Sequence, residues 1–346
     1  NTTEGPLKDF QMTDKDRYEL TIAGWLHDCG KVTTPEYVVD KATKLERVYN
    51  RIHEIRMRFE VLLRDAMIER LDALAAGESP EAVEARHASE VARLQEEFAF
   101  VAECNIGGEL MAPERIERLQ RIAEQRWTRH FDDRLGISHE EATRLEGFPT
   151  RPLPVSEKLL EDKPEHLMPR IETKALDPKY GFKMSVPDHQ FNFGELYNLS
   201  VSRGTLTAEE RFKVNEHIVQ TIVMLENLPF PKNLQRVPEY AGTHHETLLG
   251  TGYPRQLGPD QLSIPARIMA IADIFEALTA TDRPYMRPKT MSTALGIMAR
   301  MRDSGHLCPD LFELFIDFGP VLHPGGEVPD TGQKPHVQPL GARHLA

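Results

Sequence analysis

The sequence has 346 residues, of which 40% are hydrophobic and 28% are charged, and its formal charge at pH 7 is −12. This length is enough for one large domain or two modest ones with a real core. The acidic charge excludes broad electrostatic attraction to DNA or to anionic membranes, so we expect no DNA partner. No apolar run approaches the roughly 20 residues that cross a bilayer, so we expect no membrane segment in this chain.

The cysteines and the first residues bear on the compartment. Cys29, Cys104 and Cys308 are scattered and form no Cys-x-x-Cys pair. An odd, dispersed set argues against a disulfide framework or a zinc ribbon and favours a reducing compartment. The sequence begins Asn-Thr-Thr-Glu-Gly, without an initiator Met or a signal-peptide pattern. We therefore expect a cytoplasmic protein, and a chain that is a piece of a larger sensor protein.

The first predicted helix begins at Thr13. Its apolar stripe has i, i+4, i+7 spacing and consists of Tyr18, Ile22 and Trp25. Gly30 is the expected stop of this helix. His27 and Asp28 are then predicted to lie in its last turn, where their side chains can face a cleft.

Long, charged, proline-poor helices are predicted from about residue 45 to residue 145. They are expected to run from Glu46 to Leu74, from Pro80 to Glu103 and from Pro113 to Arg134. Residues 147–190 are proline-rich and irregular, typical of a loop or linker. Together these segments form a predicted helical insertion and linker over residues 46–190. Four histidines in the helical part form no spaced ligand set and are interpreted as solvated: His53, His87, His130 and His139.

Helical patterning resumes in the last third of the chain. Thr207-Ala-Glu-Glu210 is a capping box that opens a helix through Leu228. Further helices are predicted over Val237 to Leu248 and over Ile264 to Thr279. No alternating strand pattern of any length is found, so the predicted class is all-α. The predicted organisation is one bundle formed by residues 1–45 and 191–318, followed by a disordered tail over residues 319–346.

Adjacent residues of metal-ligand type occur twice, as His27-Asp28 and as His244-His245. Neighbours on a helix point about 100° apart and cannot easily grip one ion. Two such doublets in one chain therefore indicate a cluster of metals, with each member of a pair serving a different ion.

His217 and Asp273 extend this candidate ligand set. Imidazole with carboxylate suits iron, manganese, cobalt, nickel or zinc better than Ca²⁺ or Mg²⁺. A carboxylate that bridges two ions would lower the pKa of a shared water and give hydroxide at neutral pH. Each of these histidines taken alone is more commonly an ordinary core or surface residue.

Five strings of the sequence carry a resemblance to a known family. They are Leu26-His-Asp-Cys-Gly-Lys31, Asn215-Glu-His217, His244-His-Glu-Thr-Leu-Leu-Gly-Thr-Gly-Tyr-Pro254, Arg267-Ile-Met-Ala-Ile-Ala-Asp-Ile-Phe-Glu-Ala-Leu278 and Arg283-Pro-Tyr285. In this order and spacing they resemble the HD-GYP subgroup of HD-domain phosphohydrolases. The resemblance covers residues 13–45 and about 195–315, so the fold that it implies is an HD-domain helical bundle interrupted by a long helical insertion.

The resemblance also implies an activity and a cofactor. The implied cofactor is a set of two or three divalent transition-metal ions, with iron or manganese expected. The implied reaction is hydrolysis of cyclic di-GMP by metal-activated hydroxide, to linear pGpG and/or GMP.

Carried over residue by residue, the resemblance implies a role for each ligand. Asp28 would bridge two metals, and His27 and Asp273 would hold one of them. His217 and His244 would hold the second, while His245 would sit on a third ion or brace the site. Lys31 would contact the scissile phosphate and neutralise the charge that builds on it.

The Gly-Tyr-Pro string is the expected substrate loop. Gly252 permits close backbone approach, and Pro254 restricts Tyr253 to extended conformations, so that a fixed ring orders a lid or offers a face to guanine. Three further residues are candidate phosphate contacts or structural contacts: Arg267, Arg283 and Tyr285.

The sequence departs from the family's pattern in several places. None of the 26 residues before His27 is the histidine that the family usually supplies there, and His189 is a weak substitute. Leu249 stands where an Asp usually precedes Gly250, and Phe275-Glu276 replaces Phe-Asp. These departures motivate two alternatives: a catalytically impaired regulator that binds nucleotide or a signalling partner, and a hydrolase for another cyclic dinucleotide. The long insertion between Lys31 and His217 is a homodimer contact, a partner-docking arm or a decorative helical hairpin.

Overall fold

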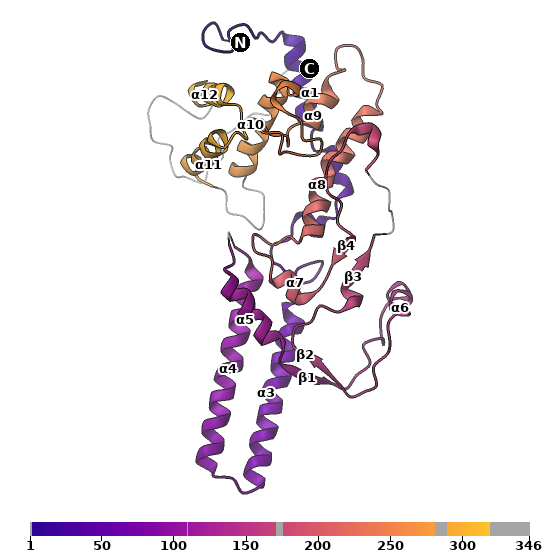
Figure 1. Cartoon of the computed structure of the whole chain (residues 1–346), viewed down its shortest axis with the longest axis vertical. Helices are drawn as coiled ribbons and strands as arrows, with labels where there is room; N and C mark the ends of the chain where they lie inside the picture. The colour runs from indigo at the N-terminus through magenta and orange to yellow at the C-terminus, as the bar shows by residue number, and fades with distance from the viewer. Residues whose placement is uncertain (1, 109, 171–175, 281–288, 319–346) are drawn as a thin grey trace, which may run out of the picture. The chain divides into compact units, whose positions relative to one another are not determined.

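The computed structural model describes residues 2–108, 110–170, 176–280 and 289–318 (Figure 1). It is 56% helical with few short strands, so the predicted all-α class is confirmed. The predicted tail at residues 319–346 lies outside the described residues. No helix among the described residues is long and apolar enough to cross a membrane.

The chain divides into two compact units. The first unit consists of residues 1–35, 174–186 and 213–346, and the second of residues 36–173 and 187–212. Most of the predicted insertion over residues 46–190 lies in the second unit, while its boundaries as a domain remain a prediction.

The first unit is built from helices and short helical turns. Its elements are α1 (Asp14–Leu26), η1 (Cys29–Thr33), η3 (Pro178–Tyr180), α8 (Ala208–Glu226, from residue 213 onward), α9 (Val237–Gly242), η4 (Pro259–Gln261), α10 (Ile264–Thr279), α11 (Met291–Asp303) and α12 (Pro309–Phe318).

The second unit contains helices and the strands of the described chain. Its elements are α2 (Glu36–Val39), α3 (Ile52–Ala75), α4 (Pro80–Ile106), α5 (Pro113–Ala123), β1 (Arg126–Arg129), α6 (His139–Leu145), β2 (Val155–Lys158), η2 (Pro164–His166), β3 (Leu167–Pro169), β4 (His189–Asn192), α7 (Glu195–Leu199) and the first turn of α8.

Helix α1 begins where the sequence predicts but buries a different face. Thr13 and Asp16 form a capping box at its start. The predicted apolar stripe is wrong at both ends, because Tyr18 is 53% exposed and Trp25 is 63% exposed. The buried face is centred on Ala23 and on Glu19, whose carboxylate accepts the Arg236 N–H at 2.7 Å just before α9 begins. This polar contact, which apolar periodicity cannot reveal, acts together with the packing of α1 apolar residues against α9.

Several other predicted helix ends need correction. Helix α3 begins at Ile52 and not at Glu46, and α4 continues to Ile106. Helix α9 ends at Gly242 and not at Leu248, whereas α10 has the predicted bounds. The capping box at the start of α8 is confirmed, because Thr207 Oγ1 accepts the Glu210 N–H at 3.3 Å and the Glu210 carboxylate accepts the Thr207 N–H at 2.9 Å.

The described residues contain two small antiparallel sheets that the sequence did not predict. Helix α5 ends at Ala123, and the chain then enters β1, where Trp127 lies opposite Glu157 of β2. The second sheet pairs β3 with β4, with Met168 opposite Phe191. Each strand has three or four residues, too short to show an alternating pattern against a polar background.

The core of the second unit lies between α3 and α4, which form a hairpin (Figure 1). Phe59 of α3 meets Phe98 of α4 with ring centroids 5.5 Å apart. Two internal ion pairs join the remaining segments. Lys41 reaches Glu210 at 2.7 Å in a fully buried contact, and Arg58 binds Glu195 through two hydrogen bonds of 2.7 and 2.8 Å.

Candidate metal centre

Gly30 sets the position of the His27-Asp28 pair. His27 caps the end of α1 and Asp28 already lies outside it, so the placement of Asp28 in the last helical turn was wrong. Gly30 does not act as a left-handed helix stop. Its N–H donates to Thr221 Oγ1 at 3.0 Å, and a Cβ on Gly30 would lie 2.0 Å from the His217 carbonyl oxygen. The absence of a side chain therefore lets η1 press against α8 and brings Asp28 beside His217.

Three histidines are oriented by backbone carbonyls in the same way. Each Nδ1 lies near the carbonyl oxygen three residues earlier, at 2.7 Å for His27, 2.6 Å for His217 and 2.7 Å for His244. A carbonyl oxygen only accepts, so each Nδ1 carries a proton. A histidine held in this way directs its Nε2 away from the carbonyl and toward the site, the usual arrangement of metal-ligating histidines.

Asp28 lies between the histidines. One of its oxygens, Oδ2, is 3.2 Å from His27 Nε2, and the other, Oδ1, is 3.2 Å from His217 Nε2. His244 Nε2 lies 4.0 Å from Oδ1. The two oxygens thus face different histidines, which is the geometry that a bridging carboxylate needs. Lys31 Nζ lies 2.5 Å from Oδ2.

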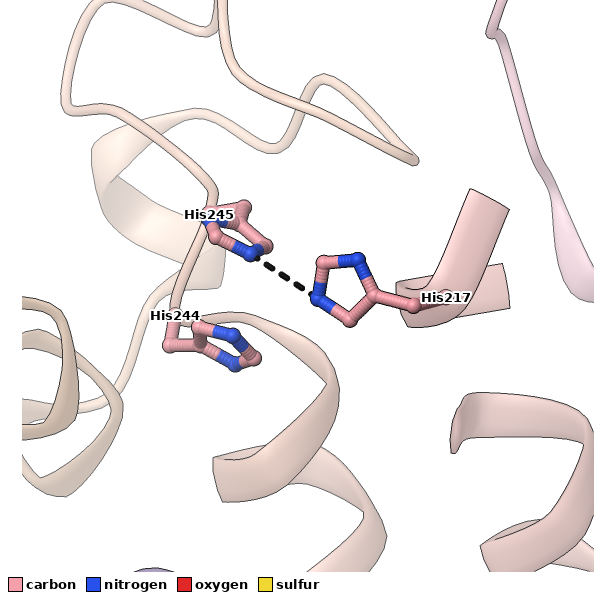
Figure 2. Close-up of side chains that lie close together, drawn as sticks. All are labelled: His217, His244 and His245. Atoms are coloured by element: carbon pink, nitrogen blue, oxygen red, sulfur yellow. Dashed lines mark hydrogen bonds between the residues drawn. The ribbon is translucent and has the colours of Figure 1, made fainter. Parts of the chain in front are cut away.

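The described residues contain two groups whose ligand atoms all lie within 4.8 Å of one another. One group is His27, Asp28 and His244, with Asp273 Oδ1 a further 3.5 Å from His27 Nε2. The other group is the three histidines of Figure 2, His217, His244 and His245. Each group contains both members of one adjacent pair, His27-Asp28 in the first and His244-His245 in the second. The expectation that the two members of a pair bind different ions therefore remains a prediction.

Figure 2 shows the second group, with the His217 ring on α8 pointing toward the His244-His245 segment. His217 Nε2 and His245 Nε2 are 3.1 Å apart. Two nitrogens that bind one ion at about 2.1 Å are separated by roughly this distance. The spacing therefore suits a shared ion.

A buried atom tests whether a metal fits. The His244 side chain is fully buried, and its Nε2 has no hydrogen-bond partner among the described residues. Leaving a polar nitrogen buried and unpaired costs about 1–3 kcal/mol. A divalent cation would satisfy that lone pair, and the imidazole and carboxylate donors around it suit a transition metal. The residues present therefore fit a metal.

Burial keeps two of the imidazoles neutral. It lowers the pKa of His244 to about 4 and lowers the pKa of His245 well below its ordinary value. His27 behaves differently. Burial lowers its pKa, but its hydrogen bonds with Asp273 and Asp28 outweigh that effect and raise the pKa to about 10. A metal would replace this proton as the counter-charge to the two carboxylates.

Both carboxylates are held ionised. Burial acts to raise the pKa of Asp28, but its hydrogen bonds with His217 and His27 hold it well below the usual range. The pKa of Asp273 is also lowered, because the hydrogen bond with His27 outweighs the opposing effect of burial. The site thus presents ionised oxygens together with the neutral nitrogens of His244 and His245, as divalent ions require.

The Gly-Tyr-Pro loop packs directly on the histidine pair. A Cβ on Gly252 would lie 2.5 Å from Glu246 Cα and 2.6 Å from the His245 carbonyl oxygen. The Tyr253 N–H donates to that carbonyl at 3.2 Å, and the Tyr253 ring stacks on the His245 ring with centroids 4.7 Å apart. Burial raises the pKa of Tyr253, so its hydroxyl stays protonated. Tyr253 therefore braces His245.

Glu246 is a site residue that sequence reasoning missed. Its carboxylate accepts the N–H of Arg255 at 2.7 Å and the N–H of Leu257 at 2.9 Å, so it fastens the far side of the loop. Its position directly after His244-His245 was the available signal. The helix predicted through Leu248 hid this signal, because it placed Glu246 inside a helix and not in a loop. Thr221, the acceptor for Gly30, was missed as well.

The other predicted contacts have varied outcomes. Arg267 donates to the carbonyls of Leu262 at 2.9 Å and Pro259 at 2.6 Å, which are structural contacts, and a phosphate contact remains a prediction. Leu249 is 65% exposed. Arg283 and Tyr285 lie outside the described residues. His189 lies in β4 of the second unit, and its role as a substitute ligand remains a prediction.

Comparison with known proteins supports the motif resemblance. Residues 154–311 match the HD domain family. The chain is 34% identical over 113 residues to 3'3'-cGAMP-specific phosphodiesterase 1 of Vibrio cholerae, covering 33% of this chain and 25% of the relative. It is 34% identical over 134 residues to a cyclic di-GMP phosphodiesterase of Pseudomonas aeruginosa, covering 39% and 29%. It is also 34% identical over 137 residues to a cyclic di-GMP phosphodiesterase of Thermotoga maritima, covering 39% and 33%.

These similarities cover part of each protein. The chain spans between a quarter and a third of the length of these three relatives. The HD domain match begins after His27 and Asp28, and the fold brings that pair beside His217 and His244 of the matched segment. The HD domain match, the motif strings and these relatives are together consistent with the chain being similar to the HD-GYP family.

Proposed function

We propose that this chain is a metal-dependent phosphodiesterase that hydrolyses cyclic di-GMP to linear pGpG and/or GMP. The observation that carries the proposal is the convergence of His217, His244 and His27 on Asp28, with His244 Nε2 buried and unpartnered. The printed names of the relatives, which are phosphodiesterases for cyclic di-GMP or 3'3'-cGAMP, support the substrate class.

The cofactor that we propose is two or three divalent transition-metal ions, with iron or manganese expected. When bound, such ions would act as Lewis acids and lower the pKa of a bound water. The candidate ligands are His27, Asp28, Asp273, His217, His244 and His245, the six predicted from the sequence.

Lys31 has the clearest role in substrate binding. Its side chain is 47% exposed, so it can turn from Asp28 toward a phosphate oxygen without unfolding any element. In that position its ammonium group would neutralise charge that builds on phosphorus during attack. Asp28, relieved of one counter-ion, would keep both oxygens directed at the histidines.

A second candidate substrate is another 3',3'-linked cyclic dinucleotide. Leu249, which is 65% exposed on the loop after the histidine pair, supports this candidate because it replaces the family's usual carboxylate. An apolar side chain at this place removes a negative charge from the loop, so the loop would present a different surface to the substrate. The third candidate is a regulator with an impaired site, which the missing upstream histidine motivates.

One experiment separates the three candidates. Protein purified anaerobically is analysed for metal content and then incubated with cyclic di-GMP, 3'3'-cGAMP and linear pGpG, with products followed by chromatography. We expect at least two transition ions per chain and cyclic di-GMP as the faster substrate. Faster turnover of 3'3'-cGAMP supports the second candidate. Bound nucleotide without turnover in metal-loaded protein supports the regulator.

Matched variants tie the activity to the site. Asp28→Ala and His244→Ala are expected to lose both turnover and bound metal. His244 belongs to both groups of donors, and Asp28 supplies the carboxylate that lies between His27 and His217. His53→Ala, which removes an exposed histidine of the second unit, is the control and should retain both. Full activity of metal-depleted Asp28→Ala would overturn the proposal.

We also propose a cytoplasmic location, on the cysteine usage and the substrate class. Finally, we propose that two copies of the chain contact each other through the helical insertion.

A further inference from the structure

Helix α3 (Ile52–Ala75) has apolar residues on two opposite faces. The inner row is buried in the second unit's core or packed against it, and it consists of Ile52, Ile55, Phe59, Leu62, Ala66 and Ala73. These residues pack against α4. A helix of a soluble hairpin needs only this one apolar face, so apolar residues elsewhere on α3 require a separate explanation.

An outer row follows the opposite face of the same helix. It consists of Met57, Val61, Arg64, Ile68, Leu71 and Ala75. Met57 is 62% exposed, Ile68 is 55% exposed and Leu71 is 56% exposed. Each member but Leu71 stands two positions after a member of the inner row, which places the two rows about 200° apart.

The outer row has the spacing of a coiled-coil seam. Its members alternate steps of four and three residues over the whole row. This is the a/d repeat that packs knobs into holes of a second helix. Among the described residues of the second unit, α3 packs mainly on α4 and, near its first turns, on β1. The half of the hairpin next to its connecting turn has no other labelled element beside it (Figure 1).

We propose that the outer row of α3 is a dimer interface, and that its occupant is the outer row of a second copy in antiparallel orientation. With the two-fold axis between Arg64 and Ile68, each a position meets a d position of the other copy. Val61 then lies opposite Leu71, and Met57 lies opposite Ala75. An isologous contact of this kind closes on itself and stops at two copies.

Arg64 selects both the occupant and the direction. A parallel pair would place Arg64 against its own copy, whereas the antiparallel pair places it against Ile68. Its charge is already met by Glu60, at 2.7 Å on the same helix, so its aliphatic stem can pack against the partner helix. Asp65 and Asp72 flank the row. In the dimer, Arg64 of one copy therefore lies near carboxylates of the other copy.

The size of the interface sets the expected affinity. The row from Met57 to Ala75 is about 27 Å long, at 1.5 Å per residue. One helix pair of this length buries less than the standard interface of about 800 Å² per partner. We therefore expect a dissociation constant of about 1–10 µM, so that the chain is dimeric at high concentration and dissociates on dilution.

Sedimentation velocity tests the interface. The complete chain is expected to sediment as a dimer at about 100 µM and as a monomer of 39.4 kDa well below the dissociation constant. The double variant Ile68→Glu with Leu71→Glu should be monomeric at both concentrations, with an unchanged circular dichroism spectrum. The matched control is Ile106→Glu with Leu110→Glu, which changes two exposed apolar residues of the same unit and should remain dimeric. A monomeric wild-type chain at about 100 µM, or a dimeric Ile68→Glu, Leu71→Glu variant, overturns the proposal.

Cross-linking tests the orientation. In the antiparallel dimer Met67 lies beside the axis and faces its own copy, whereas Met57 lies at the end of the row. A short bis-maleimide should therefore couple two chains of Met67→Cys and not two chains of Met57→Cys, with the unmodified chain as baseline for the native cysteines. A mixture of Met57→Cys with Ala75→Cys should also couple. Coupling of Met57→Cys to itself contradicts the antiparallel register and indicates a parallel pair.

Discussion

The Gly30 amide and the Thr221 hydroxyl lie 3.0 Å apart although 191 residues separate them in the sequence. This hydrogen bond fixes η1 against α8 next to His217. The contact leaves no space for a side chain, because a Cβ on Gly30 would lie 2.0 Å from the His217 carbonyl oxygen and 2.6 Å from the Thr221 nitrogen. The two halves of the candidate metal centre are thus joined through a glycine.

The substitution Gly30→Ala is expected to separate those halves. The added methyl group must push η1 and α8 apart, which costs about 1–3 kcal/mol of stability or more. We expect a lower melting temperature and a loss of bound metal, measured by calorimetry and elemental analysis. Gly296→Ala is the control, since a Cβ at that helical position of the same unit meets nothing within 4 Å. A Gly30→Ala protein with normal metal content would show that the close approach is not needed.

Sequence patterns predicted those parts of the fold that depend on local signals. The bounds of α10, the helix start at Thr13 and the capping box at Thr207 were correct, because side chains within one turn determine them. The strands β1 and β2 were missed, because their pairing joins residues about thirty positions apart. The orientation of α1 was also missed, because it depends on contacts with a distant segment, namely the Glu19 hydrogen bond at the start of α9 and the packing of Ala23 against α9.

The candidate site shows the same division. The six candidate ligands could be named from residue type together with the motif resemblance, and the structure brings them close together. The contacts that hold η1 against α8 and that hold the Gly-Tyr-Pro loop could not be predicted, because Thr221 and Glu246 make them through hydrogen bonds with backbone amides of other segments. Gly30 carried a signal that was misinterpreted: a glycine after a helix is commonly a cap, and here it allows a close approach.

Glu246 is expected to matter for substrate binding more than for metal binding. In Glu246→Gln, one acceptor oxygen is replaced by an NH₂ group, which leaves the Arg255 or Leu257 amide unpaired and costs about 1–3 kcal/mol. The loop should loosen, and KM for cyclic di-GMP should rise about tenfold at unchanged metal content. Glu239→Gln, on an exposed ion pair, is the control. Loss of metal in Glu246→Gln would instead show that Glu246 is needed to hold the metal ligands in place.

Tyr253 is expected to act through its ring. The stacking on His245, with centroids 4.7 Å apart, needs the aromatic face and not the hydroxyl. Tyr253→Phe should therefore keep metal content and turnover within about twofold, whereas Tyr253→Ala should release the His245 ring and lower metal affinity about 10–100-fold. Metal titration of the apoprotein measures both. Equal losses in the two variants would move the role from the ring to the hydroxyl.

A variant of Lys31 distinguishes an effect on phosphate binding from an effect on metal binding. Lys31→Met keeps most of the side-chain volume and removes the charge. We expect turnover to fall about 10²–10³-fold while metal content stays unchanged, because Lys31 contacts Asp28 from its solvent-exposed side. Lys8→Met, an exposed lysine of the same unit, is the control. Undiminished turnover in Lys31→Met would exclude the phosphate contact.

His166 gives the second unit a dependence on pH that is separate from the metal centre. Burial lowers its pKa from 6.5 to about 4. Its Nδ1 accepts the Lys163 N–H at 3.1 Å, and an imidazolium could not accept that bond. Because the folded pKa is lower than the unfolded one, the unfolded chain binds the proton more readily. The contribution to stability is therefore complete above pH 6.5 and is lost as pH falls from 6.5 to 4.

Urea unfolding at pH 7.5, 5.5 and 4 checks this prediction in metal-free protein. The chain has two tryptophans, so Trp127 in a Trp25→Phe background reports on the second unit alone. His166→Asn keeps an acceptor for the Lys163 N–H and does not titrate. Over this range the free energy of unfolding of the wild-type chain should fall by roughly 1–2 kcal/mol more than that of His166→Asn. This is less than the pKa shift alone would give, because the ring is only partly shielded from solvent. His130→Asn, at an exposed position, should follow the wild-type curve. Parallel pH curves for the wild-type chain and His166→Asn would show that His166 is as easily protonated in the folded protein as in the unfolded chain.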